Sequence, residues 1–149
     1  MTKPIGQTIE QRVRIAASPA TVWSFWTDAA LLCEWWGSVA EVEPRPGGIF
    51  RVTMNDGGPV MMGEYLELEP HSRLVFSFGW EPSAMGVGIP PCSTQVEVTL
   101  TADGEDTELL LRHSNLPVAH VTDHAKGWQL FVGQRLPEAV KAKGVTDGS

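Results

Sequence analysis

Residues 118–143 read VAHVTDHAKGWQLFVGQRLPEAVKAK, and this C-terminal stretch decides the fold. Its apolar residues recur every three or four positions, which is the spacing of one face of an α-helix. They are Ala125, Trp128, Phe131, Val132, Leu136 and Val140. We predict one long helix over this stretch, with a kink at Pro137, because proline removes a backbone hydrogen bond and clashes with the preceding turn.

Short β-rich segments precede this helix, and turns rich in Gly, Pro and Asp separate them. The later segments alternate apolar and polar residues, as half-buried strands do. We predict about six strands, at residues 12–15, 49–54, 60–69, 73–80, 93–101 and 107–113. Strands that follow one another through short turns form an antiparallel sheet.

Two short helices are predicted after the first strand. Ser18 is a good N-cap, and Pro19 suits the first helical position, where a missing N–H loses no partner. Asp28 starts the second helix, which we expect to end at Gly37. An antiparallel sheet with one apolar face needs a cover, and the C-terminal helix is long enough to supply it. The prediction is one α+β domain over residues 1–149, a curved antiparallel sheet wrapped around the long C-terminal helix.

The net charge excludes several classes of partner. The chain has 11 Lys and Arg against 18 Asp and Glu, a net charge of −7. Nucleic acids and anionic membrane surfaces both attract basic proteins, so we expect neither as a partner. No apolar run approaches the roughly 18 residues of a membrane span. No signal peptide is visible either, so we expect a cytoplasmic protein.

Cofactor and metal motifs are also missing from the sequence. Cys33 and Cys92 form no CxxC pair, so we expect free thiols, with a single disulfide as the alternative. His120 and His124 share a helix face without a third ligand, so we expect surface histidines and no metal. A complete phosphate-binding glycine motif and a GxSxG nucleophile motif are absent, and no cofactor is predicted. A homodimer is compatible with the chain, but no residue pattern requires one.

Aromatic residues are the main evidence for a binding site. The chain has six tryptophans against one tyrosine. Large rigid rings leave crevices where they do not interdigitate, and binding pockets are mostly apolar. The predicted ligand-lining rings are Trp36, Phe50, Phe76, Phe78, Trp80, Trp128 and Phe131. The alternative is that these rings simply fill the core.

Two polar residues are candidates to orient a ligand. His113 continues the strand face of Leu109 and Leu111, so we expect it to point at the cavity or to be a satisfied core histidine. Glu64 lies in an apolar stretch and would anchor a ligand if it pointed inward; pointing outward, it is an ordinary surface carboxylate. The proline-rich segment 81–92 has the length of a lid over the cavity mouth, or of an ordinary surface loop.

Several stretches together resemble a known superfamily. They are ASPATVW at 17–23, WWG at 35–37, PGGIFR at 46–51, GEYLELEP at 63–70, RLVF at 73–76 and HAKGW at 124–128. In this order they resemble the START-related helix-grip (SRPBCC) superfamily, in the branch of the C-terminal domain of the activator of the heat-shock protein 90 ATPase. The resemblance implies a helix gripped by a curved sheet with a ligand cavity between them, and a histidine near position 113 recurs in the branch. Pro137 departs from the family pattern, in which the last helix is normally uninterrupted.

The expected function is binding of a small apolar or aromatic molecule between sheet and helix. One alternative is an enzyme of the cyclase or dehydratase type, which would move a proton with His113 or Glu64. Another alternative is a protein-interaction module like the co-chaperone. The resemblance does not by itself imply the co-chaperone activity, because that activity also uses a separate N-terminal domain.

Overall fold

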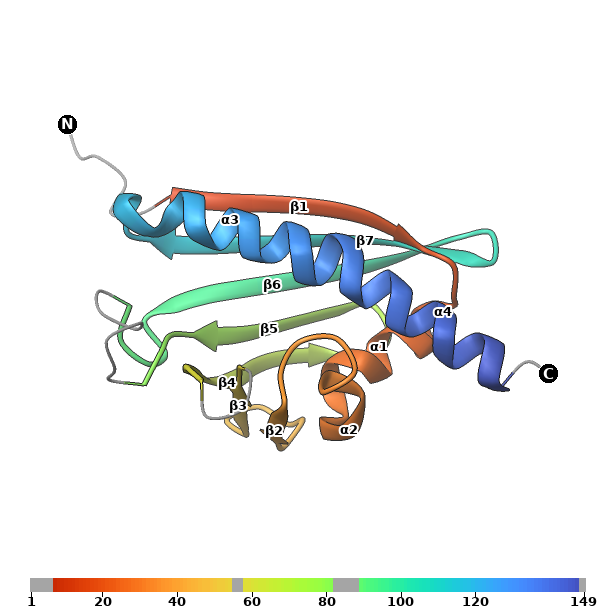
Figure 1. Cartoon of the computed structure of the whole chain (residues 1–149), viewed down its shortest axis with the longest axis horizontal. Helices are drawn as coiled ribbons and strands as arrows, with labels where there is room; N and C mark the ends of the chain where they lie inside the picture. Colours follow the sequence, from red (N-terminus) through yellow and green to blue (C-terminus); the bar gives the residue numbers. More distant parts are fainter. Residues whose placement is uncertain (1–6, 55–57, 82–88, 148–149) are drawn as a thin grey trace.

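The computed structural model describes residues 7–54, 58–81 and 89–147. These residues form one seven-stranded antiparallel sheet in the order β1-β7-β6-β5-β4-β3-β2 (Figure 1). The strands are β1 (Gln7–Ile15), β2 (Val39–Val42), β3 (Ile49–Thr53), β4 (Val60–Glu69), β5 (Arg73–Phe78), β6 (Thr94–Asp103) and β7 (Asp106–Leu116). Apart from the β1–β7 pair, every neighbouring pair is consecutive in the chain, so short turns build most of the sheet.

The predicted antiparallel sheet is confirmed, but it has one strand more than expected. β2 is the additional strand, and it pairs with β3 at the edge of the sheet through partners such as Val42 and Phe50. Its four residues are exposed or only half-buried. A short edge strand with a weak apolar pattern carries little signal in the sequence.

Both short helices begin where the sequence predicts. The Ser18 side chain caps α1 (Pro19–Thr27) by accepting a hydrogen bond from the Thr21 N–H, and the Asp28 carboxylate caps α2 (Ala29–Leu32) in the same way. The prediction that the second helix continues to Gly37 is wrong, because α2 ends at Leu32.

The two tryptophans after α2 turn into the core instead of continuing the helix. Trp35 is 2% exposed, and its indole N–H donates to the Phe25 carbonyl at 2.9 Å. The chain then passes close to β3, since a Cβ on Gly37 would lie 2.5 Å from the Thr53 carbonyl oxygen. Burial of large rings therefore overrides helix continuation at this point.

The C-terminal helix is continuous past Pro137. A 3₁₀ turn η1 (Val118–His120) leads into α3 (Val121–Leu130), a π-helical segment η2 (Phe131–Arg135) and α4 (Leu136–Asp147). The Leu136 N–H bonds to the Phe131 carbonyl, five residues back. This wider turn directly precedes the proline, whose ring clashes with the preceding carbonyls of a regular α-helix. The ribbon consequently crosses the sheet without ending (Figure 1).

The core lies between the sheet and this helix. α3 and η2 pack on β1, and α4 packs on α1 and β1. β6 and β7 alternate buried and more exposed residues along their length, so each strand presents one apolar face to the helix. Within the part of the chain that the structure describes, no helix is both long enough and apolar enough to cross a membrane.

Candidate functional site

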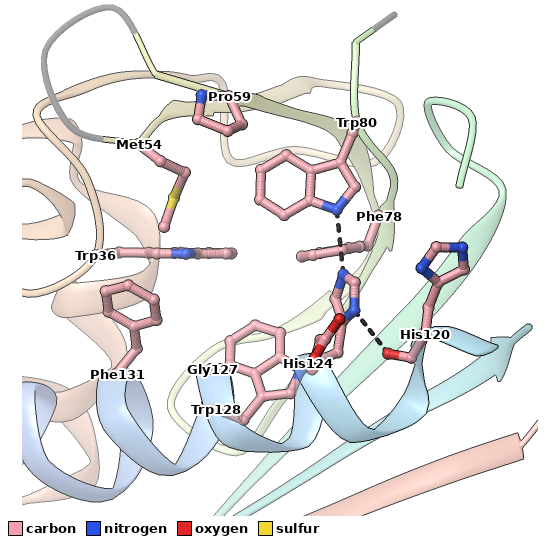
Figure 2. Close-up of a pocket in the computed structure, with 11 residues that line it drawn as sticks. Trp36, Met54, Pro59, Phe78, Trp80, His120, His124, Gly127, Trp128 and Phe131 are labelled. Carbon is pink, nitrogen blue, oxygen red and sulfur yellow. Dashed lines mark hydrogen bonds between the residues drawn. The ribbon is translucent and has the colours of Figure 1, made fainter. Parts of the chain in front are cut away.

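A pocket of about 330 Å³ lies between α3 and the ends of the strands β3, β4 and β5 (Figure 2). The chain contributes to it from four separate regions. The lining residues are Trp36, Met54, Pro59, Phe78, Trp80, His120, Asp123, His124, Gly127, Trp128 and Phe131. This volume is at the lower end of the range for small-molecule sites, and the aromatic lining is typical of them.

Aromatic rings form most of the wall. Trp36 and Phe78 have nearly parallel planes, 10° apart, with ring centroids separated by 6.5 Å. Trp80 and Met54 lie on one side of these two rings, and Trp128 and Phe131 lie on the other (Figure 2). Trp36 also packs on Trp128, with centroids 5.4 Å apart. The rings support one another and leave their faces toward the cavity.

A hydrogen bond from Trp80 to His124 joins the sheet side of the pocket to the helix side (Figure 2). The His124 Nδ1–H donates to the His120 carbonyl at 2.8 Å, because a carbonyl can only accept. The His124 Nε2 lone pair is then free to accept the Trp80 indole N–H, at 3.1 Å. Burial lowers the pKa of His124, so the neutral ring that this arrangement requires is favoured at pH 7.

A second indole–imidazole bond lies beneath the first. The Trp128 indole N–H donates to Nδ1 of His113 at 3.0 Å, so the His113 Nε2–H donates to the Thr94 hydroxyl at 2.8 Å. The Thr94 hydroxyl in turn donates to the Phe78 carbonyl. Burial, with a smaller contribution from His124, lowers the pKa of His113 to about 3. This chain of bonds fixes Trp128 and the end of β5, which are two walls of the pocket.

The predicted aromatic walls are largely found together. Trp36, Phe78, Trp80, Trp128 and Phe131 all line the pocket. Contacts between the two sides hold them together, since Phe78 packs on Trp128 and Trp80 bonds to His124.

The other predicted site residues lie elsewhere. His113 is fully buried behind Phe78 and Trp128, and both of its ring nitrogens are hydrogen-bonded, so it is a satisfied core histidine. Phe50 and Phe76 are fully buried and stack on each other, with centroids 4.4 Å apart. They fill the core instead of lining the pocket.

Glu64 does not point into the interior. It is exposed, whereas its strand neighbours Gly63 and Tyr65 are buried. Side chains alternate along a strand, and Tyr65 occupies the inner face, where its hydroxyl donates to the Trp26 carbonyl. The inward position considered for Glu64 is therefore wrong.

Sequence reasoning missed several lining residues in η1 and α3, and two more at positions 54 and 59. His124 was expected on the surface, but it is half-buried against Trp80. The spacing of His120, His124 and Trp128 every four residues was the available signal, because it puts these side chains on one helix face. Met54 and Pro59 carry no such signal.

The predicted lid segment and the cysteine and histidine residues were the other candidate features of the sequence. Residues 82–88 of the predicted lid lie outside the described residues. At the base of that segment, the Trp80 N–H bonds to the Ile89 carbonyl and the Glu81 N–H bonds to the Val60 carbonyl. Cys33 and Cys92 are free thiols. Among residues 7–54, 58–81 and 89–147, no group of three His, Cys, Asp or Glu side chains is placed to hold a metal.

Comparison with solved structures supports the fold. An AHSA1-like protein from Rhizobium etli is 38% identical, with a TM-score of 0.71 over 94% of this chain and 86% of that one. A protein from Mesorhizobium loti is 22% identical, with a TM-score of 0.79 over 91% of this chain and 98% of that one. An HSP90 activator from Plasmodium falciparum is 23% identical, with a TM-score of 0.69 over 85% of this chain and 91% of that one. No match to a curated protein is found.

The family model described as "Activator of Hsp90 ATPase homolog 1-like protein" matches residues 16–141. This match covers both short helices, all strands after β1 and the pocket face of the C-terminal helix. The chain therefore belongs to the AHSA1-like family of helix-grip domains, as the resemblance of its motifs implied.

Proposed function

We propose that this protein binds one small apolar or aromatic molecule in the pocket between α3 and the sheet edge. The supporting observation is the cavity of about 330 Å³ with aromatic rings on several sides. Burying apolar ligand surface contributes about 25 cal/mol per Å² before the cost of association. A planar ligand of two or three rings is then expected to bind with a micromolar Kd.

The two alternatives have less support from the geometry. The enzyme alternative relied on His113 and Glu64, but His113 has no free ring nitrogen and Glu64 is exposed. An interaction module would favour a filled interior and a continuous apolar patch. Large exposed apolar residues in the described chain lie on separate elements: Val39, Leu66, Val118 and Leu130.

Gly127 provides a direct test of the pocket. It lines the cavity from the middle of α3, and a Cβ added there would meet no atom within 4 Å. Gly127→Leu therefore places a side chain in open space and also replaces a poor helix former with a good one. We expect the variant to fold at least as stably as the parent protein and to lose at least tenfold in affinity for the neutral fluorophore N-phenyl-1-naphthylamine.

The matched control is Gln129→Leu, an exposed position two residues further along the same helix. It adds similar apolar surface without entering the pocket, so its affinity should equal that of the parent protein. Fluorescence titration measures the affinity, and thermal unfolding confirms the fold. Unchanged affinity in Gly127→Leu, or no saturable binding by the parent protein, would contradict the proposal.

A further inference from the structure

Two of the three tryptophans that line the pocket are hydrogen-bonded within the protein. Three tryptophans line it, and each has one indole N–H that can only donate. The Trp80 N–H is taken by His124, and the Trp128 N–H by His113. These same bonds occupy the lone pairs of both histidines, so neither pair offers a donor or an acceptor to a ligand.

Trp36 is the exception among the three. Its side chain is 5% exposed, and within the described part of the chain its indole N–H has no hydrogen-bond partner. Among the described residues, two side-chain nitrogens are fully buried and lack a hydrogen-bond partner, those of Trp26 and Arg51. The Trp36 nitrogen is not one of them, so it keeps some solvent-accessible surface. Trp36 lines the cavity, so a molecule inside it lies beside this ring.

The remaining polar groups are at the opposite side of the pocket. His120, at the end of η1, lies across it from Trp36 (Figure 2), and Asp123 is exposed three residues later, in the first turn of α3. Between them and Trp36 the lining is formed by aromatic faces, Met54, Pro59 and Gly127. Among the described lining residues away from His120 and Asp123, a ligand therefore meets one unpaired donor, the Trp36 N–H, beside apolar groups.

We propose that the ligand is a planar aromatic molecule with a hydrogen-bond acceptor, such as a ring ketone, and that the Trp36 indole N–H donates to this acceptor. The inference rests on the proposed function and specifies its ligand class. An unpartnered buried N–H is costly, because it loses water without gaining a new bond. A hydrocarbon leaves the Trp36 N–H in that condition, whereas a carbonyl oxygen satisfies it.

The test compares 9-fluorenone with fluorene, two planar three-ring molecules that differ by a carbonyl in place of a methylene. Equilibrium dialysis gives the ratio of their affinities in the parent protein, in Trp36→Phe and in Trp23→Phe. Trp23→Phe is the matched control, since it makes the same exchange of indole for phenyl at a partly buried position that does not line the pocket. The ratio in favour of fluorenone should fall about fivefold in Trp36→Phe, the equivalent of one ordinary hydrogen bond, and stay unchanged in Trp23→Phe.

A second measurement uses the unmodified protein and covers the case in which Trp36→Phe fails to fold. In a ¹⁵N-edited NMR spectrum, fluorenone should move the Trp36 indole proton downfield, and fluorene should not. If both molecules bind but neither the ratio nor this proton responds, the role of Trp36 is overturned while the pocket stands. If neither molecule binds, the proposed function fails, and the inference fails with it.

Discussion

The two halves of the C-terminal helix face the same sheet but meet it differently. Val132, Leu136 and Val140 are at most 2% exposed and pack tightly in the core. In α3, by contrast, Trp128 and Gly127 border a cavity. Branched aliphatic side chains interdigitate readily, whereas rigid rings beside a glycine do not. One layer of helix on sheet thus contains a packed end, which stabilises the fold, and an open end, which is available for binding.

The largest effect should come from the packed end. Leu136→Ala removes a fully buried side chain and is expected to lower the free energy of unfolding by about 3 kcal/mol, because the new cavity cannot fully collapse. Phe131→Ala removes more atoms, but from a half-buried position at the pocket wall, and should cost less. Urea unfolding of both variants measures the difference. Equal losses would mean that the two ends are packed alike.

A pH series examines the buried histidine behind the open end. His113 has its pKa lowered from 6.5 to about 3, so its neutral form stabilises the folded state. That stability is complete above pH 6.5 and is lost as the pH falls toward 3, because the unfolded chain binds the proton first. We expect a slope of up to about 1.4 kcal/mol per pH unit in this range.

The control for this series is His113→Gln, which cannot titrate. The slope that remains in this variant comes from His124, whose pKa burial also lowers, and from carboxylates. Urea unfolding at several pH values gives both slopes. Parallel profiles for the two proteins would show that His113 is not held neutral by the fold.

A smaller effect is expected at the wall of the pocket. Trp80→Phe keeps an aromatic ring, although a smaller one, but removes the hydrogen bond to Nε2 of His124, at a cost of about 1 kcal/mol in stability. The bond favours the neutral imidazole, so its loss should raise the pKa of His124. An NMR titration of the histidine ring protons measures this change. A pKa identical to that of the parent protein would show that the indole bond does not hold the ring neutral.

The predictable part of the fold came from local patterns. Examples are the caps at Ser18 and Asp28 and the helical periodicity around Trp128. Each of these signals involves residues only a few positions apart, so it is visible in the sequence. β2 escaped prediction because it owes its existence to pairing with β3, not to its own apolar content. Similarly, the early end of α2 depends on where Trp35 is buried.

The candidate site was predictable only as a set of rings. Phe50, Phe76 and Phe78 have equivalent signals as aromatic residues on strands, yet only Phe78 reaches the cavity. Which ring lines a space depends on sheet curvature and on the partner rings, and both arise from distant segments. His113 illustrates the same limit, since its partners Thr94 and Trp128 lie 19 and 15 residues away in the chain.

The π-helical segment before Pro137 has a consequence for comparing relatives of this protein. A π turn takes up about one residue more than an α turn, so the helix beyond it is rotated by roughly 100° relative to an uninterrupted continuation. The π segment at residues 131–135 therefore acts as a one-residue insertion in the helix, and Leu136 and Val140 beyond it lie buried on the face toward the sheet. We expect a relative whose last helix has no π segment to close the same face with one residue fewer, so that its alignment with this chain needs a single-residue gap inside that helix.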